Sequence, residues 1–203
     1  MNVATTTRQQ HMNTYNRENI GKLISWRGDH FVYEYGEDNV IKFSKFDFLL
    51  GFEKAQKIVP EEYTLCKQFF GEYILDSEIV VSDDEKRVAL IQRKIVGHCL
   101  TRDDLRNEEI RRQFREIAER YSAMVKSGHS EIDLVGHEGV FRIFNRCLGN
   151  ILVTNTGKLV IYDVTSLNMS RFALFIRPLM YCLAKIFLPF QRSTIHRFLA
   201  QAQ

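Results

Sequence analysis

Hydrophobic and polar residues alternate along the first part of the chain, the pattern of strands that are buried on one side. The alternation predicts three short strands over residues 22–26, 30–35 and 39–43. Clusters that contain glycine and acidic residues separate them at 27–29 and 36–38, where such residues favour turns. We therefore expect a small antiparallel sheet early in the chain.

A helical segment and two further strands follow this sheet. Pro60 is expected to break the helix, because proline lacks the N–H donor and its ring clashes with the preceding turn. The second half of the helix then covers residues 61–70 and ends at Gly71 as its C-cap. The next two strands are expected over about 73–82 and 87–94.

The clearest helix spans about residues 108–127, and Gly128 is expected to end it. Its apolar residues recur at helical spacing and form one stripe, which consists of Ile110, Phe114, Ile117, Ala118, Tyr121, Met124 and Val125. The last forty residues also look helical. The order of elements indicates an α+β chain, with sheet in the first half and mostly helix in the second.

A second, tighter hairpin is predicted between these helical regions. Two apolar strands, 148–153 and 158–163, flank the turn 154–157. Asn150 begins the first strand and Asp163 ends the second, so we expect the two side chains to lie side by side. Paired oxygen ligands of this kind hold Mg²⁺ on the phosphates of a nucleotide. The alternative is that Asn150 is a turn residue and that Asp163 caps the segment after it.

Composition limits the class of protein. The chain has 203 residues and 45% hydrophobic residues, enough for one packed domain and too many for a disordered chain. The net charge of +3 is too small to indicate a nucleic-acid partner, and none is expected. The basic character lies in the tail, where no acidic residue follows Asp163 and the cations are Arg171, Arg177, Lys185, Arg192 and Arg197.

Cysteines and both ends of the chain bear on its location. The four cysteines, Cys66, Cys99, Cys147 and Cys182, form neither a zinc pattern nor a disulfide framework, which favours a reducing compartment and a cytoplasmic protein. Residues 1–19 are polar and aperiodic, so we expect a loosely ordered lead-in and no signal peptide. The apolar tail 172–190 is interrupted by charges and proline and is shorter than a bilayer span of ~20 residues. It is expected to pack on the domain, or alternatively to contact the inner face of a membrane as an interfacial helix.

The hairpin from Asn150 to Asp163 resembles the catalytic-loop and metal-binding hairpin of the protein-kinase-like superfamily. Within it the chain looks most similar to compact bacterial types: RIO kinases, sugar and lipopolysaccharide-core kinases, and PhoP-regulatory-network proteins. The resemblance covers about residues 20–168. It implies a single two-lobed domain over 20–203, with a small antiparallel N-lobe sheet and a reduced helical C-lobe.

The resemblance also places the lobes and the nucleotide-binding residues. The implied N-lobe covers residues 20–94, the hinge 95–99 and the C-lobe 100–203. Lys42, in Val-Ile-Lys-Phe, would neutralise the α- and β-phosphates of ATP. Without that context, a lone strand lysine is by default an exposed residue on a half-buried sheet.

Four other residues are implied in nucleotide binding. Glu62 is the expected helix partner of Lys42, with the adjacent Glu61 as the alternative; either is otherwise a solvated acid in the first turn of a helix. Gly28 stands in the place of the glycine-rich phosphate loop, which has three glycines in protein kinases and one here. Adenine would bond to the backbone near Lys94 and Val96, in a segment that could equally be an ordinary strand-to-helix connection.

One position departs from the family. The catalytic aspartate is expected five residues before Asn150, and this position is Asn145. Asparagine can hydrogen-bond a substrate hydroxyl but cannot take its proton. Loss of a general base typically removes a factor of roughly 100–10,000 in rate. Three polar residues lie nearby in the sequence, His137, Glu138 and Arg146. We expect them to lie in a solvated loop; the alternative is that one of them substitutes for the missing base.

Two functional hypotheses follow. The first is a phosphotransferase that uses ATP and Mg²⁺ and acts on a hydroxyl of a small molecule, sugar or lipid headgroup, rather than of a protein. Few residues follow the metal motif, and no Ala-Pro-Glu sequence is present to help build a platform for peptides. The alternative is a pseudokinase, a nucleotide-binding or interaction module without efficient transfer. An unrelated structural domain would require the ordered motifs to be a coincidence.

Overall fold

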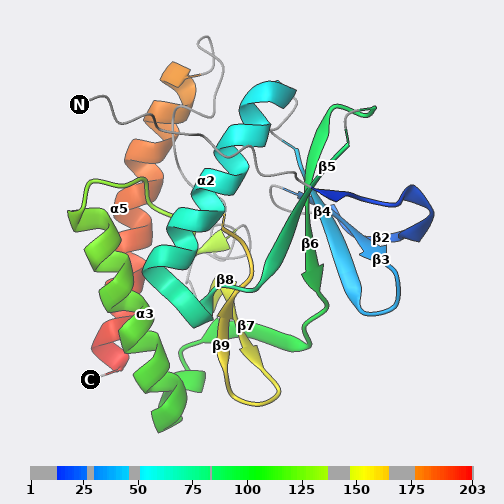
Figure 1. The fold of residues 1–203 in the computed structure, drawn as a ribbon. Helices are drawn as coiled ribbons and strands as arrows, with labels where there is room; N and C mark the ends of the chain where they lie inside the picture. The colour runs from blue at the N-terminus through cyan, green and yellow to red at the C-terminus, as the bar shows by residue number, and fades with distance from the viewer. Residues whose placement is uncertain are drawn as a thin grey trace, which may run out of the picture.

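The computed structural model describes residues 13–26, 30–45, 51–82, 84–136, 147–164 and 177–202. In this part the fold is α+β, with a six-stranded mixed sheet, a three-stranded sheet and three α-helices (Figure 1). The three helices lie together on one side of the six-stranded sheet. The α+β class predicted from the sequence is confirmed.

The six-stranded sheet has the order β1-β5-β6-β4-β3-β2. All neighbouring strands are antiparallel except β1 and β5, which run parallel. The sheet is therefore mixed, whereas we expected a purely antiparallel sheet from the sequence. The parallel pair arises because β1 lies within the expected lead-in 1–19 and adds an edge to the sheet. The strands are β1 (Asn13–Thr14), β2 (Ile20–Ser25), β3 (His30–Tyr35), β4 (Asn39–Ser44), β5 (Ser77–Ser82) and β6 (Arg87–Arg93).

The two faces of this sheet have different partners. On β4, Ile41 and Phe43 are buried against Tyr15 on the face that lies away from the helices. The alternate residues, Lys42 and Ser44, point to the opposite face because successive side chains of a strand alternate. That second face is the one that α2 covers.

Helix α2 (Phe52–Phe70) is continuous, and the predicted break at Pro60 is wrong. Proline removes its own N–H bond, here the one to the carbonyl of Gln56, and its ring crowds the preceding turn. Packing makes up for that loss, because one stripe of the helix is buried on both sides of Pro60, at Ala55, Glu62, Cys66 and Phe70. Gly71 ends the helix with a φ of 56°, as the sequence predicted.

The three-stranded sheet consists of β7 (Gly97–Thr101), β8 (Cys147–Thr154) and β9 (Leu159–Ile161), in that order and antiparallel. The hairpin predicted from the sequence is therefore confirmed, with Ile151 opposite Ile161. Residues 94–96 join β6 of the first sheet to β7 of the second. A parallel bridge between Ile74 and Ile161 also ties the segment after α2 to β9.

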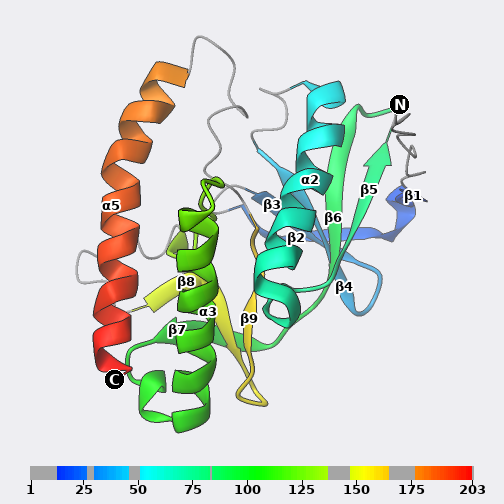
Figure 2. The ribbon, with the colours of Figure 1, turned by 60° about the vertical axis from the view of Figure 1, so that its left-hand side comes forward.

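Helices α3 (Glu108–Lys126) and α5 (Arg177–Gln201) complete the fold. Figure 2 shows α3 between α2 and α5. Their buried side chains share the largest apolar cluster with the end of α2, β8 and β9. Three short 3₁₀ helices are η1 (Arg17–Asn19), η2 (Gly71–Tyr73) and η3 (Asp104–Arg106). Among the described residues, no helix has the length and apolar character needed to cross a membrane.

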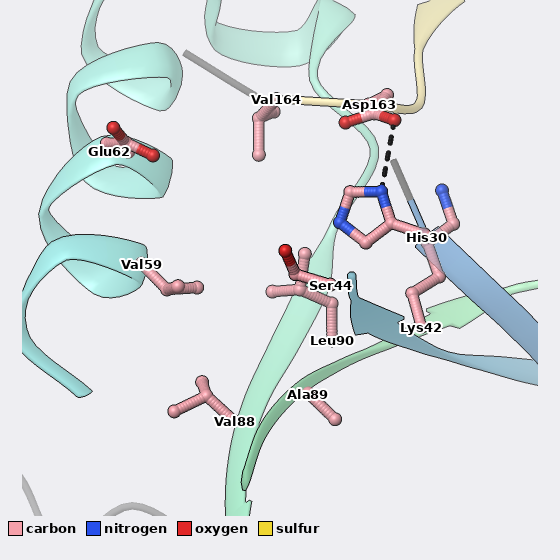
Figure 3. Close-up of a pocket in the computed structure, with 10 residues that line it drawn as sticks. All are labelled: His30, Lys42, Ser44, Val59, Glu62, Val88, Ala89, Leu90, Asp163 and Val164. Atoms are coloured by element: carbon pink, nitrogen blue, oxygen red, sulfur yellow. Dashed lines mark ion pairs between the residues drawn. The ribbon is translucent and has the colours of Figure 1, made fainter. Parts of the chain in front are cut away.

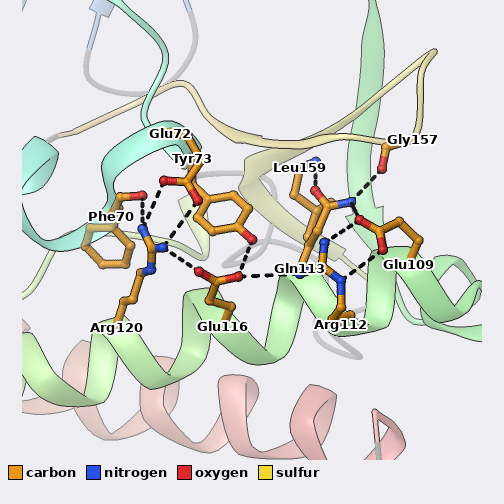
Figure 4. Close-up of polar contacts among 10 residues, drawn as sticks. All are labelled: Phe70, Glu72, Tyr73, Glu109, Arg112, Gln113, Glu116, Arg120, Gly157 and Leu159. Carbon is orange, nitrogen blue, oxygen red and sulfur yellow. Dashed lines mark hydrogen bonds and ion pairs between the residues drawn. The ribbon is translucent and has the colours of Figure 1, made fainter.

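Polar contacts fix α3 to the end of α2 and to the β8–β9 hairpin (Figure 4). Arg120 donates to the carbonyl of Phe70 at 2.7 Å and pairs with Glu72 at 3.2 Å, which holds the C-terminal end of α2. About two turns earlier in α3, Gln113 donates to the carbonyl of Gly157 at 3.0 Å and accepts from the N–H of Leu159 at 2.8 Å. Helix α3 thus fixes the turn and strand that lead to Asp163.

Candidate functional site

A small cavity lies where the six-stranded sheet, α2 and the end of β9 meet (Figure 3). Its volume is about 20 Å³, and a single water needs roughly 10–15 Å³ by the same measure. The space between the lining side chains of this partly open cavity is therefore about that of one water or one metal ion. The cavity is lined by His30, Lys42, Ser44, Val59, Glu62, Val88, Ala89, Leu90, Asp163 and Val164.

Lys42 is buried on β4, with 7% of its surface exposed. Its Nζ donates to the carbonyl of Tyr162 at 2.9 Å and lies 4.7 Å from the centre of that residue's ring. The same carbonyl accepts from Gln92 at 3.2 Å. Burial lowers the pKa of Lys42, and the carboxylate of Asp163 opposes that shift. A lysine held in this way gains stability in its charged form when an anion enters.

Glu62 and Glu61 occupy different environments on α2. Glu62 is buried and lines the cavity, whereas Glu61 is exposed. Of the two candidates from the sequence, Glu62 is therefore the one that lines the cavity together with Lys42. The stripe of the helix that packs on the sheet carries Glu62, which explains why this charged residue is buried.

Asp163 lies two residues after the end of β9, and its side chain lines the cavity. Its Oδ2 lies 3.4 Å from Nδ1 of His30. In Figure 3 the imidazole of His30 lies beneath Asp163, with Lys42 on one side and Glu62 on the other. The cavity thus gathers two carboxylates, an ammonium and an imidazole from four separate elements of the chain.

The sequence reasoning missed His30, although a signal for it was present. The turn at residues 36–38 sets the register of β3 on β4, so that His30 pairs with Ser44 and Val32 with Lys42. Cross-strand partners share one face of a sheet. Counting back from the turn would therefore have placed His30 on the same face as Lys42.

Asn150 does not lie among the residues that line the cavity. Its backbone is next to that of Asp163, since its carbonyl accepts from the N–H of Tyr162 at 3.3 Å. Its side chain, however, donates to the carbonyl of Asp133 at 2.8 Å. Asn150 is opposite Tyr162 in the hairpin, and the residue after Tyr162 points to the other face. The structure therefore brings Asp163 to His30, and Asn150 to the segment around Asp133.

That segment packs closely on Asn150. Gly136 has a φ of 66°, and a Cβ atom there would lie 2.6 Å from Oδ1 of Asn150. The N–H groups of Val135 and Gly136 donate to the side chain of Asp133 at 2.9 and 2.8 Å. Glycine is therefore required at position 136 both by the backbone angle and by the contact with Asn150.

The two residues predicted to border adenine lie in the connection between the sheets. The N–H of Lys94 donates to the carbonyl of Asp38 at 2.7 Å, and its Nζ donates to the carbonyl of Glu37 at 2.7 Å. The side chain of Val96 is 72% exposed. In this arrangement the N–H of Lys94 is taken by the β3–β4 turn rather than offered to a ligand.

Two predicted site residues, Gly28 and Asn145, lie outside the described residues, as do His137, Glu138 and Arg146. Within the described residues, no three histidine, cysteine, aspartate or glutamate side chains are grouped so that they could hold a metal ion.

No protein-family model matches the chain, and no curated protein matches it in sequence. What the site can do is therefore inferred from the chemistry of its own residues. An ammonium and an imidazole can attract phosphate, and a carboxylate beside them can hold a cation.

Proposed function

We propose that the chain is a kinase-like phosphotransferase that binds ATP with Mg²⁺ and phosphorylates a hydroxyl group. The acceptor would be a small molecule, a sugar or a lipid headgroup. In this proposal the six-stranded sheet and α2 form one lobe, and the three-stranded sheet with α3 and α5 forms the other. One observation carries it: Lys42, Glu62 and Asp163, which are far apart in the sequence, line one cavity where the two lobes meet.

Each of these residues has a role that its environment supports. Lys42 would bind phosphate oxygens, and its buried position makes an anionic partner favourable. Glu62, on the buried side of α2, would orient the Lys42 ammonium. Asp163 is the carboxylate that fits Mg²⁺, beside a space large enough for one ion. When bound, Mg²⁺ neutralises the charge on the transferred phosphoryl group.

The alternative is a pseudokinase, and one observation favours it. Asn145 stands where the general base is expected, so the chain has no carboxylate there to take the proton of an acceptor. Under this alternative the same residues bind a nucleotide, or a partner, without efficient transfer.

Thermal unfolding with ATP and Mg²⁺ tests nucleotide binding. A ligand present at 100 times its Kd stabilises the native state by about 2.7 kcal/mol. For a chain of this size that raises the Tm by roughly 5–10 °C. We expect this shift in the wild type, and its loss in Lys42→Met and Asp163→Asn.

Matched surface variants control for general effects of charge. Lys22→Met removes an exposed strand lysine, and Asp76→Asn removes an exposed carboxylate. Both should keep the full shift. If the wild type shows no shift, or if all four variants show the same one, nucleotide binding at this cavity is ruled out.

Turnover separates the two candidate functions. Radiolabelled ATP is incubated with the wild type and with Asn145→Asp, in the presence of sugar and lipid-headgroup acceptors. A pseudokinase gains activity when the base is restored, by about 100-fold or more if the position is catalytic. A phosphotransferase is already active as the wild type. An inactive wild type with an inactive Asn145→Asp, despite ATP binding, would leave only the interaction module.

A further inference from the structure

We propose that His30 is a metal ligand, so that the cation which accompanies the nucleotide is held by Nδ1 of His30 together with Asp163. The preferred cation is then a first-row transition dication such as Mn²⁺, rather than Mg²⁺. This inference rests on the proposed function, because phosphate oxygens would complete the coordination. It replaces the pair expected from the sequence, Asn150 with Asp163, by a different pair.

The separation of the two side chains fits two ligands of one ion. Nδ1 of His30 and Oδ2 of Asp163 are 3.4 Å apart. This exceeds the usual range of about 2.7–3.2 Å for an N–H···O hydrogen bond. An ion with bonds of about 2.0–2.2 Å places adjacent ligand atoms roughly 2.9 Å apart in octahedral coordination and roughly 3.4 Å apart in tetrahedral coordination, so one ion can contact both side chains.

The chemical type of the ligands determines which cation is preferred. Magnesium takes oxygen ligands almost exclusively, whereas imidazole nitrogen suits transition dications. Asn150, whose amide oxygen would have supplied the second oxygen ligand, does not line the cavity, and its Nδ2 donates to the carbonyl of Asp133. A site made of one imidazole, one carboxylate and phosphate oxygens therefore favours Mn²⁺ or Co²⁺ over Mg²⁺.

The surroundings hold both ligands in place and limit what can enter. The side chains of His30 and Asp163 are only 11% and 17% exposed. The cavity they line has the volume of one ion or water. Lys42 lines the same cavity, and its ammonium opposes a lone cation by like-charge repulsion. The cation is therefore expected to bind with the nucleotide, whose phosphates offset that repulsion, rather than alone.

The test compares cations in the presence of ADP. The Tm of the wild type is followed as Mn²⁺ or Mg²⁺ is titrated at a fixed ADP concentration. We expect half-maximal stabilisation at a Mn²⁺ concentration at least about tenfold below that of Mg²⁺, since even the loss of a group that only orients a metal ligand changes metal affinity by about 10–100-fold. In His30→Gln the two cations should become equivalent.

A spectroscopic measurement reads the ligand directly. Electron spin echo modulation of the Mn²⁺·ADP complex should show coupling to ¹⁴N in the wild type and none in His30→Gln. His196→Gln removes an exposed histidine on α5 and is the control, in which coupling and preference should both persist.

The outcomes separate this inference from the proposed function. Stabilisation by ADP with equal cation preference in the wild type, or nitrogen coupling that survives in His30→Gln, overturns the role of His30 and leaves nucleotide binding intact. Absence of any stabilisation by ADP with either cation overturns both.

Discussion

Burial shifts the pKa values of Lys42 and Tyr73 in opposite directions for one physical reason. Removal from water disfavours the charged form of any group, which lowers the pKa of a lysine and raises that of a tyrosine. The pKa of Lys42 is lowered in this way. The pKa of Tyr73 is raised to about 12 by burial and by its hydrogen bond to Glu116, which is 2.8 Å long. The two residues therefore give stability opposite dependences on pH.

The raised pKa of Tyr73 predicts how the stability of the protein changes with pH. A group whose folded pKa is raised keeps its proton in the native state after the unfolded chain has lost it. Its contribution to the free energy of unfolding is therefore complete below pH 10 and falls as the pH rises from 10 toward 12. We expect Tyr73→Phe to show a shallower fall in this range, measured by urea unfolding at several pH values. Equal slopes for the variant and the wild type would contradict the assignment.

Helix α3 connects elements that the sequence separates widely. Its polar face contacts the end of α2 through Arg120 and the β8–β9 hairpin through Gln113. Its apolar stripe contributes to the core shared with α5. Asparagine at position 107 accepts from the N–H groups of Glu109 and Ile110 and so caps its first turn. The position of Asp163 thus depends on a helix that does not line the cavity.

Substitution of Gln113 tests whether its hydrogen bonds anchor the β8–β9 hairpin to α3. Gln113→Leu leaves the buried N–H of Leu159 without its partner, and an unsatisfied buried group costs about 1–3 kcal/mol. We expect the free energy of unfolding to fall by that amount, measured by urea unfolding. Arg112→Leu, on the same helix, breaks surface ion pairs with Glu109 and Glu116 and should cost less than about 1 kcal/mol. Equal effects of the two variants would mean that Gln113 does not anchor the hairpin.

Charge is distributed unevenly over the whole chain. The residues after Asp163 carry five cations and no acid. Helix α5 buries its second half at Gln191 and Phe198, whereas Tyr181 and Ile186 in its first half are 53% and 73% exposed. Exposed apolar residues among cations are typical of helices that contact anionic membranes. The expectation of membrane contact therefore stays a prediction, now localised to the first half of α5.

Sedimentation with vesicles tests it. We predict binding to vesicles that contain an anionic lipid and none to vesicles of phosphatidylcholine alone. Ile186→Asp should weaken binding at least about tenfold, because burial of such a side chain is worth roughly 1.5–3 kcal/mol. Val96→Asp is the matched control, since Val96 is exposed to nearly the same extent, 72%, far along the chain. If both variants bind as the wild type does, α5 is not the contact surface.

The sequence alone determined most of the local structure. Alternation and turn residues predicted the strands that became β2, β3, β4 and the β8–β9 hairpin, because these patterns depend on neighbouring residues. The same local rule failed at Pro60, where packing of α2 on the sheet outweighs one lost hydrogen bond. It also missed β1, which exists only because β5 offers an edge.

For the site, the sequence selected Lys42, Glu62 and Asp163 as candidates but not their neighbours. Strand alternation and register place a side chain on a face, and only tertiary packing decides what that face meets. Asn150 and Asp163 are adjacent in the hairpin, yet they point to opposite faces, one toward Asp133 and the other toward His30. That choice depends on how the six-stranded sheet docks on the hairpin, and contacts across such distances leave no local pattern in the sequence.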